Sequence, residues 1–559
     1  MNRSVVSMKG SVMIIAALAT ALGLFVFRPV TLMLAASTSQ DKSPTDKSPT
    51  AAYVPRAQLC VTVPVGPQML CPIIPGNIGP DPMLDQRVAY NGIVGAHPTS
   101  AQTDVQTPFD NLSWQTFVAL NWTLGKESQP PNQGLQGDGR RVWEGWPRVA
   151  AVFGNGPVQA NCSAPPPGVM VFSIASNGKG QPVGQNEEYI QAATDDPLID
   201  VSGNWTIYER RINNLEVAYL RAPNGKTTWT LATLQGQKNL ASQGGSVDFP
   251  SAGPTGAPRT GAIEIKAAWR VLDPAQRQQN KKKYYLVPAL LKVAPDLVTQ
   301  KTPVCAVVDM GLVAMHIIQK NPKTTNALKP EWFWSTFEHV DNAPMAQKPC
   351  DPTSPSTCGW FGNLNCTADL SKPASGYSYF NLADRGAVVN QSPQESKTGP
   401  RFAWNSTRPF AKNYLVPAGT GFGTQVSRCW AIYSITDELN RQWRGELAKV
   451  GSVFQNYMLV GTQWGASITS TPDPKVPTDA VPSYLSNTVV ETYLQTLYDR
   501  NNPFGTGSCV SCHSAAVLPA APTVSSNLSF LPFLAKHALV RQKLEKTVQQ
   551  LKREAKQSH

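Results

Sequence analysis

Two cysteines and a histidine stand together near the end of the chain, in the string "GTGSCVSCHSAAV" that begins at Gly505. Cys509 and Cys512 are three positions apart, and His513 follows the second of them directly. The chain has only ten cysteines and six histidines among its 559 residues, so this grouping needs a chemical reason. A three-residue step places both thiols on the same side of one helical turn, with the imidazole next to them.

This arrangement is the usual one for covalent attachment of haem. The sulfur atoms of Cys509 and Cys512 add to the two vinyl groups of a protoporphyrin, and the imidazole of His513 binds the iron. Ser508 precedes the first cysteine and is a suitable N-cap for a short helix that carries the motif. The sequence therefore predicts one covalent haem c, with Cys509 and Cys512 as cofactor-binding residues and His513 as the proximal iron ligand.

Two other chemistries use the same residue types. Cys509 and Cys512 alone can form a redox dithiol or a local disulfide, although neither use needs a histidine. Zinc can take all three residues, but a closed tetrahedral site needs a fourth ligand, and the following 40 residues offer only His537. Covalent haem accounts for all three residues at their observed spacing.

A second axial ligand on the iron separates electron transfer from small-molecule chemistry. Two axial ligands usually serve electron transfer, whereas an open position invites peroxide, oxygen or another small molecule. No methionine follows the haem motif, and the candidates for the sixth position are His316, His339, His97, His537 and Met458. We take His316 first because it lies in an apolar predicted strand. For each histidine the competing interpretation is an ordinary hydrogen-bonded residue.

The N-terminal residues have the pattern of an export signal. Arg3 and Lys9 precede seventeen uncharged residues from Ser11 to Phe27, and small residues suited to cleavage follow. Seventeen helical residues span about 26 Å, so residues 1–36 are a secretory signal peptide or a single N-terminal anchor. The repeated "DKSPT" within residues 37–52 predicts a disordered tether. We expect an exported, periplasmic protein that is either soluble or tethered by its anchor.

Eight cysteines lie outside the haem motif, and in an exported chain they suggest up to four disulfide bonds. The most local pairing is Cys60 with Cys71, and the next is a pair within Cys350, Cys358 and Cys366. Buried free thiols are the alternative interpretation. The eight residues are Cys60, Cys71, Cys162, Cys305, Cys350, Cys358, Cys366 and Cys429.

Short β-type segments dominate the middle of the chain. They are rich in Val, Ile, Tyr and Trp and are bounded by Pro, Gly and Asn. We predict an α+β protein in which residues 53–480 form a large β-rich body of one or two domains. The predicted strands lie in "GVMVFSIAS" from Gly168, "NWTIYERRI" from Asn204, "AIEIKAAWRVL" from Ala262, "KYYLVPALL" from Lys283 and "VCAVVDMGLVAMHIIQK" from Val304.

Helical patterns stand on both sides of the haem motif. The segment "SYLSNTVVETYLQTLYD" from Ser483 has a stripe of apolar residues four apart, which predicts a helix. The stripe consists of Leu485, Val489, Tyr493 and Leu497. After the motif, residues 533–559 predict a basic amphipathic helix. We expect residues 481–532 to form a small cytochrome c-like haem module that closes the larger body.

The excess of positive charge is concentrated near the two ends of the chain. Lys and Arg exceed Asp and Glu by twelve, with three of the basic residues in residues 1–36. Seven more lie between Lys536 and Lys556, against two acidic residues. This basic helix could contact a membrane surface or an acidic redox partner protein, or it could be a solvated helix packed on its own domain. Export and the lack of a binding motif exclude nucleic acid as an expected partner.

Several further segments carry a family resemblance. Together with the haem motif they resemble a group of large exported bacterial cytochrome c family proteins with a single C-terminal Cys-x-x-Cys-His motif. The resemblance runs from about residue 108 to about residue 532, and it implies one covalent haem on a long body that is not itself a cytochrome. The segments are "DNLSWQTFVALNW" from Asp110, "EIKAAWRVL" from Glu264, "WFWSTFEHVDNAP" from Trp332, "YMLVGTQW" from Tyr457 and "NTVVETYLQTLY" from Asn487.

These observations favour an electron-transfer protein, in which the body docks a redox partner or shields the haem. The alternative is a haem-dependent oxidoreductase, peroxidase- or oxygenase-like, whose β-rich body forms a substrate pocket over an open iron position. A third interpretation is a binding or sensing protein in which the haem is structural.

Overall fold

The computed structural model divides the chain into two units, Met1–Tyr53 and Val54–His559. All the residues that the structure describes lie in the second unit. They are residues 70–75, 106–154, 162–175, 188–191, 197–251, 260–298, 302–320, 332–351, 366–371, 376–386, 388–391, 394–395, 414–415, 424–465, 480–482, 484–495 and 509–535.

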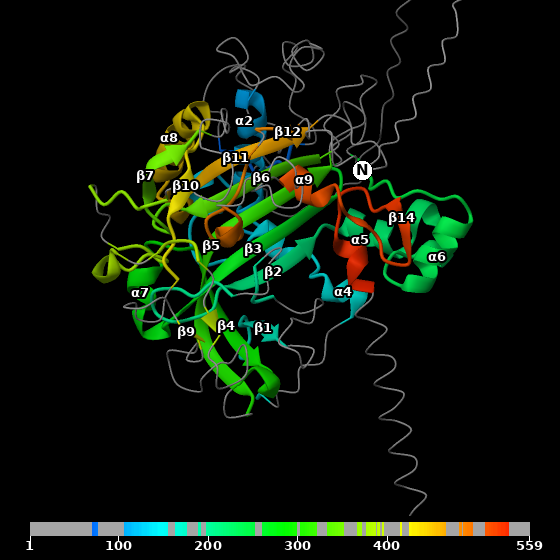
Figure 1. The fold of residues 1–559 in the computed structure, drawn as a ribbon, viewed down its shortest axis with the longest axis horizontal. Coiled ribbons are helices and arrows are strands. Elements are labelled where there is room, and N and C mark those ends of the chain that lie inside the picture. Colours follow the sequence, from blue (N-terminus) through cyan, green and yellow to red (C-terminus); the bar gives the residue numbers. More distant parts are fainter. Residues whose placement is uncertain are drawn as a thin grey trace, which may run out of the picture. The chain divides into compact units, whose positions relative to one another are not determined.

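A mixed sheet of eight strands forms the centre of this unit among the described residues (Figure 1). The strands are β1 (Met170–Ile174), β2 (Ile207–Ile212), β3 (Ile263–Leu272), β4 (Leu286–Val293), β5 (Val304–Lys320), β6 (Trp332–His339), β11 (Tyr457–Gly465) and β12 (Ala480–Val481). Their order is β1-β4-β5-β6-β11-β12, and β3 pairs with both β5 and β2. Only β1 and β4 run parallel; the other pairs of this sheet are antiparallel.

Strand β5 connects the two halves of the sheet because it is long enough to pair with three other strands. Its first half pairs with β4, its second half pairs with β6, and β3 lies along the opposite edge. The strand has 17 residues, and almost all of its second half is buried. Such a run of β-branched and apolar residues is typical of a strand that is covered on both faces.

The remaining strands form small pairs, and short helices connect the sheet strands. The pairs are β7 (Met345–Cys350) with β10 (Arg428–Trp430), β8 (Gln394–Glu395) with β9 (Tyr414–Leu415), and β13 (Val517–Leu518) with β14 (Ala521–Ser525). The helices are α2 (Gln106–Leu120), α3 (Pro131–Gly134), α4 (Ala150–Phe153), α5 (Asn214–Arg221), α6 (Leu234–Ser242), α7 (Arg277–Asn280), α8 (Ser434–Lys449) and α9 (Cys509–His513). Two 3-10 turns that matter below are η11 (Thr492–Leu494) and η12 (Leu531–Leu534).

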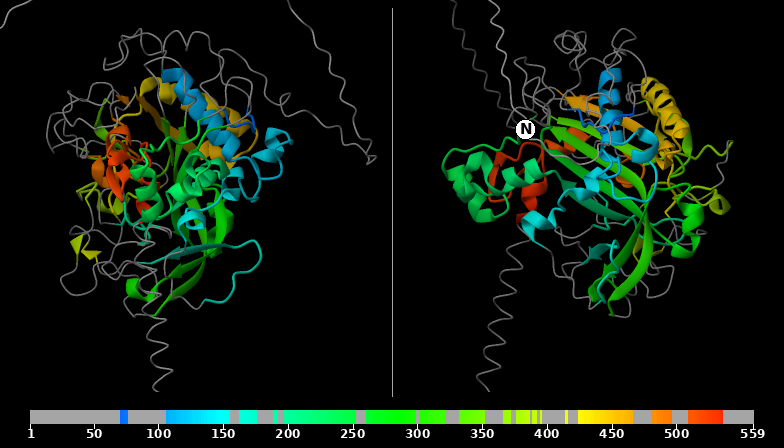
Figure 2. Two further views of the ribbon diagram at one scale, coloured as in Figure 1. Left: turned by 90° about the vertical axis from the view of Figure 1, so that its right-hand side faces the viewer. Right: turned by 180° about the vertical axis from the view of Figure 1, so that it is seen from behind.

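Helices α2 and α8 cover one face of the sheet (Figure 2, left). The ring of Phe117 stacks on Phe337 of β6 at 4.2 Å, and Trp114 meets the same ring edge-on at 5.0 Å. Trp114 also donates its indole N–H to Asn440 of α8 at 3.1 Å, which ties the two helices together. These large buried rings supply much of the apolar area that stabilises this layer.

The C-terminal segment, residues 509–535, covers part of the opposite face together with α5 and α6 (Figures 1 and 2). Trp334 of β6 and Val510 of α9 belong to the same buried apolar cluster. Gln237 of α6 fixes the segment by donating to the carbonyl of Pro532 at 2.8 Å. Helix α5 begins at a side-chain cap, in which Asn213 accepts a hydrogen bond from the amide of Glu216 at 3.0 Å.

Disulfide bonds link distant parts of the chain. Cys162 pairs with Cys305, and Cys366 pairs with Cys429. Cys71 and Cys350 are disulfide-bonded as well. The expectation of bridges in the body is therefore confirmed. Cys366 pairs with Cys429, so it does not take part in the expected local pair. A pair between Cys350 and Cys358 stays a prediction, because Cys358 lies outside the described residues. The pairing of Cys60 lies outside the described residues.

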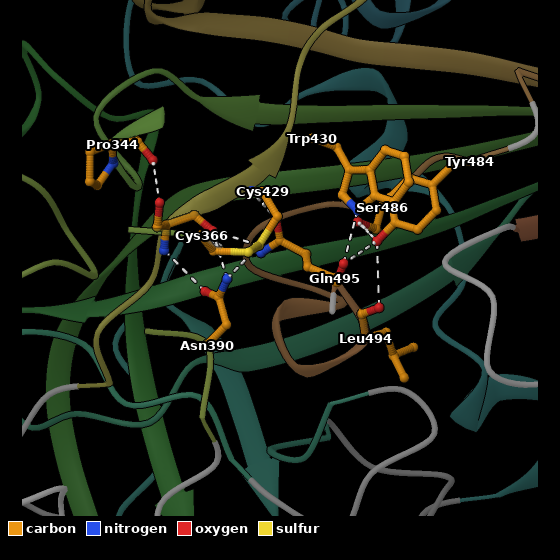
Figure 3. The surroundings of a disulfide bond; sticks show 10 residues. Pro344, Cys366, Asn390, Cys429, Trp430, Tyr484, Ser486, Leu494 and Gln495 are labelled. Carbon is orange, nitrogen blue, oxygen red and sulfur yellow. Dashed lines mark hydrogen bonds between the residues drawn. A yellow bond between two sulfur atoms is a disulfide. The ribbon is translucent and has the colours of Figure 1, made fainter. Parts of the chain in front are cut away.

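The surroundings of the second bridge connect it to the segment that precedes the haem motif (Figure 3). The amide of Cys429 donates to the side chain of Gln495 at 3.0 Å, and Trp430 donates its indole N–H to the Gln495 carbonyl at 2.9 Å. The rings of Trp430 and Tyr484 stack with centroids 3.5 Å apart. The hydrogen bonds and the ring stack next to this disulfide thus hold β10 against residues 484–495.

The α+β class and all five predicted strands are confirmed, as β1 to β5. The helix predicted from Ser483 is wrong over the described residues 484–495, which form turns and η11. Polar side chains accept hydrogen bonds from backbone amides in this segment. The amide of Thr488 donates to the side chain of Glu338 at 3.0 Å, and the amide of Val489 donates to the side chain of Asn487 at 2.9 Å. Such bonds compete with helical ones.

Other expectations fall at or beyond the edges of the described residues. The basic helix predicted for residues 533–559 lies outside them except for its first three residues, which belong to η12 or follow it. The leader and tether also lie outside. Among the described helices, none combines the length and apolar character that crossing a bilayer requires.

Replacing both Cys366 and Cys429 with Ala should lower the free energy of unfolding by about 4 kcal/mol, because the bridge closes a loop of 63 residues in the unfolded chain. Denaturant titration of the oxidised full-length protein measures the change. A loss below about 1 kcal/mol would show that the bridge contributes little to holding this part of the fold together.

Candidate functional site

Helix α9 carries the two free cysteines of the described residues and rests on the sheet. The amide of Val510 donates to the side chain of Gln463 in β11 at 2.9 Å. Val510 is buried, whereas Cys509, Cys512 and His513 are half-buried. The expected short helix over the motif is confirmed, and its buried residue anchors it while the three chemical side chains keep partial access.

A hydrogen bond fixes the orientation of the His513 ring. Its Nδ1 lies 2.6 Å from the carbonyl oxygen of Leu528, which can only accept, so Nδ1 carries the proton. The ring also meets Phe530 and Trp334, with centroids 5.1 and 6.2 Å away. Within the described residues no hydrogen bond uses Nε2. The neutral tautomer therefore presents Nε2 as a lone-pair donor, as an iron ligand requires.

The turn that presents the Leu528 carbonyl has an unusual backbone. Asn527 has φ 55° and Leu528 has φ 70°, both in the left-handed region that non-glycine residues rarely adopt. The side-chain oxygen of Asn527 accepts from Lys320 of β5 at 2.8 Å and from the amide of Phe249 at 3.2 Å. These contacts hold the turn in its strained form, and strain of this kind is typical of functional sites.

Burial sets the protonation states of the motif. It lowers the pKa of His513 to about 4, against the opposing effect of the hydrogen bond to Leu528. The imidazole is therefore neutral at physiological pH, as metal binding requires. Burial also raises the pKa of Cys509 and Cys512. A redox dithiol needs a lowered thiol pKa, so this environment disfavours that alternative.

A row of polar residues crosses the sheet on the face that α9 covers. In register, Lys266 of β3 pairs with His316 of β5, and His316 pairs with Thr336 of β6. Paired residues of antiparallel strands share a face, so all three side chains lie on it. The next row on the same face contains Trp334, which touches His513. His316 is also close enough for its charge to lower the pKa of His513.

His316 has an unsatisfied nitrogen on this face. Its Nε2 is buried and has no hydrogen-bond partner, and its nearest acidic atom is Oε2 of Glu491, 3.5 Å away. Burial opposes ionisation of Glu491, but His316 and the amide of Asn487 outweigh burial and hold the pKa of Glu491 below its usual value. A buried nitrogen without a hydrogen bond is costly unless another group satisfies it, and Glu491 is its nearest acidic neighbour among the described residues.

The structure brings His316 toward the motif but places the other described candidates elsewhere. His339 is buried, and its Nε2 lies 2.8 Å from the carbonyl oxygen of Lys283. Burial lowers the pKa of His339 to about 3. Met458 lies at the end of β11 remote from Gln463, where α9 docks. His97 and His537 lie outside the described residues.

The donor set of this face fits a covalently held haem. It provides two free thiols three residues apart, an oriented neutral imidazole and a second buried imidazole nitrogen, His316 Nε2, which makes no hydrogen bond and lies 3.5 Å from Glu491 Oε2. Among the described residues, no group of three or more His, Cys, Asp and Glu side chains is gathered as for a bare metal ion.

Sequence reasoning missed several residues that build the site. Gln463, Leu528 and Glu491 act through a side-chain amide, a backbone carbonyl and a carboxylate that folding brings near the motif. No spacing rule connects them to Cys509. The aromatic run "WFWSTFEH" from Trp332 supplies Trp334, but it lies far from the motif in the sequence, and nothing in its spacing connects it to Cys509.

No family model, no curated protein and no solved structure matches the chain.

Changing Asn527 to Ala should lower the free energy of unfolding by about 2 to 3 kcal/mol, because two buried donors lose their acceptor. Asn527→Gly loses the same bonds but accepts a positive φ without strain, so its loss should be about 1 kcal/mol smaller. Thermal unfolding of both variants measures the difference. Equal losses would mean that the backbone of this turn carries no strain.

Proposed function

We propose that the protein is an exported c-type cytochrome that binds one haem covalently and transfers electrons. Cys509 and Cys512 would form the two thioether bonds, and His513 would be the proximal iron ligand. The observation that carries the proposal is the hydrogen bond from His513 Nδ1 to the Leu528 carbonyl, which leaves Nε2 available beside two free thiols. The bound haem would supply reversible one-electron exchange at its iron.

The residues around the motif support this assignment with complementary roles. The Leu528 carbonyl holds the imidazole in one tautomer and orientation, and such partners tune the basicity of a ligand. Trp334 and Phe530 border the ring and limit the access of water. Gln463 fixes the amide of Val510, so the helix that bears both thiols is held against β11.

We also propose His316 as the second axial ligand. The support is the place of His316 on the same sheet face, its effect on the pKa of His513 and its buried Nε2, which makes no hydrogen bond and has Glu491 as its nearest acidic neighbour. Two imidazole ligands favour electron transfer over chemistry at an open iron. Glu491 Oε2 lies 3.5 Å from this same Nε2 and would have to leave it for iron to bind, after which the nearby carboxylate would offset the positive charge of the ferric state.

Export to the periplasm and the redox partner belong to the same proposal. The disulfides Cys162–Cys305 and Cys366–Cys429 support an oxidising compartment, where covalent haem is also assembled. In this proposal residues 481–532 act as the haem module, and an acidic redox partner or a membrane surface meets the basic C-terminal residues.

Replacing Cys509 and Cys512 with Ala should remove haem staining from a denaturing gel, because thioether bonds survive unfolding and coordination does not. The control variant replaces Cys162 and Cys305, which are also paired cysteines but lie outside the motif, and it should keep the stain. Both proteins must be matured with haem-attachment machinery. A wild-type protein that carries zinc or no metal after such maturation would refute the proposal.

The variant His316→Ala should open the ferrous iron to carbon monoxide, which the wild type should not bind. The matched control is His339→Gln, which changes a buried histidine that bonds to the Lys283 carbonyl and should leave the spectrum unchanged. Absorption spectra with and without carbon monoxide give the answer. Ready binding by the wild type would remove His316 as ligand and favour the oxidoreductase alternative.

A further inference from the structure

A buried lysine at the end of β5 lies next to the turn that orients His513. The side chain of Lys320 is 1% exposed, and its Nζ donates to the side-chain oxygen of Asn527 at 2.8 Å. The same Nζ lies 3.4 Å from Oδ1 of Asp248 and 5.2 Å from the ring centroid of Trp332. Burying an ammonium group is costly unless it is paired and hydrogen bonded. The bond to Asn527 therefore replaces part of the hydration that Lys320 loses.

Three hydrogen bonds fix the position of Asn527. Its side-chain oxygen accepts from Lys320 and also from the amide of Phe249, in the loop after α6, at 3.2 Å. Its own amide donates to Oγ of Ser525 at 3.2 Å. The residue has φ 55°, a left-handed conformation that costs energy for any residue other than glycine. These bonds supply the stabilisation that keeps the backbone in this conformation.

The conformation of this turn sets the direction of the carbonyl that His513 uses. Leu528 follows Asn527 at φ 70°, and its carbonyl accepts from Nδ1 of His513 at 2.6 Å. Peptide groups are planar, so the backbone dihedrals of the two turn residues alone decide where the carbonyl points. A relaxation of Asn527 toward an ordinary φ would therefore turn the carbonyl away from the imidazole.

We infer that Lys320 is a positioning residue for the proximal imidazole. By holding Asn527 it keeps the Leu528 carbonyl directed at Nδ1 of His513, and it thus maintains the hydrogen bond that fixes the tautomer and tunes the basicity of the ligand. Lys320 acts through the turn and is not itself a ligand. This inference rests on the proposed function, because it assigns the role to His513 as an iron ligand.

The test measures how fast the Nδ1 proton of His513 exchanges with solvent. The sample is the reduced, haem-matured full-length protein with 15N-labelled histidine, and the chain has only six histidines. Lys320→Met removes the ammonium group and keeps a side chain of similar length. Exchange at His513 should become about tenfold faster or more, because the turn loses a bond to a charged donor and opens more often.

His339 supplies a reference in the same spectrum. Its Nδ1 accepts from the amide of Asp341 at 3.1 Å, so Nε2 carries the proton and donates to the carbonyl of Lys283 at 2.8 Å. Exchange at His339 should keep its wild-type rate in Lys320→Met. An equal acceleration at both histidines would show a general loss of stability and would overturn the inference.

A double-variant comparison shows whether Lys320 acts through Asn527. Lys320→Met and Asn527→Ala both remove the bond between these two side chains. The double variant should therefore exchange its His513 proton no faster than the faster of the two single variants. Effects that multiply would mean that Lys320 reaches the imidazole by another route, against the inference.

Arg211→Met is the matched control. Arg211 of β2 is also a buried cation beside a carboxylate, since its guanidinium lies 2.7 Å from Glu209. It pairs in register with Ile265, which belongs to the core on the face that α2 and α8 cover. Its replacement should leave exchange at His513 unchanged.

Asn527→Asp tests the same link without removing a buried cation, and it serves if Lys320→Met does not fold. The carboxylate can accept both bonds and forms a stronger, charge-assisted one with Lys320, and aspartate tolerates a positive φ. Exchange at His513 should become several-fold slower.

The outcomes separate this inference from the proposed function. If haem is covalently attached but Lys320→Met exchanges its His513 proton at the wild-type rate, or Asn527→Asp does not slow the exchange, the inference is overturned while the proposed function stands. If haem staining itself is absent, the proposed function has failed instead.

Discussion

Strand β5 carries two residues on which the site depends, His316 and Lys320. Their position relative to the haem motif depends on the register of this strand. His316 and Lys320 are four positions apart on it and therefore point to the same face. His316 faces the haem motif, while Lys320 holds Asn527 and so the turn that orients His513. A shift of one residue in the pairing would send both side chains to the opposite face, among the rings that α2 and α8 cover. The many strand pairs along β5 make such a shift costly.

Polar side chains lie close to the motif, and each of them contacts a particular group of the site. Gln463 holds the amide of Val510, and Glu491 lies beside His316. Buried polar groups without partners destabilise a fold, so natural proteins retain them mainly where they serve function. The Nε2 of His316, which makes no hydrogen bond and lies 3.5 Å from Glu491 Oε2, is on the same face as the motif. In our proposal, iron binds this nitrogen.

The sequence was most informative where the signal is local. The Cys-x-x-Cys-His spacing identified the short helix, and runs of Val, Ile, Tyr and Trp located β1 to β5. Helix α2 was missed because it is buried nearly all round and shows no polar stripe. Helix α8 was missed although Leu439, Trp443 and Leu447 lie four apart, a helical pattern that the sequence does contain.

The helix predicted from Ser483 was wrong because Asn487 and Thr488 bind to the sheet instead. Contacts such as His513 with Leu528 depend on a strained turn that no spacing rule announces.

The most direct test of the central claim is X-ray diffraction from the haem-matured protein at the iron absorption edge, which locates iron independently of any assumed ligand. The account predicts one iron position bound by Nε2 of His513 and Nε2 of His316, with the porphyrin joined to the sulfur atoms of Cys509 and Cys512. It would be contradicted by iron located away from α9, by another metal at the motif, or by Cys509 and Cys512 joined to each other.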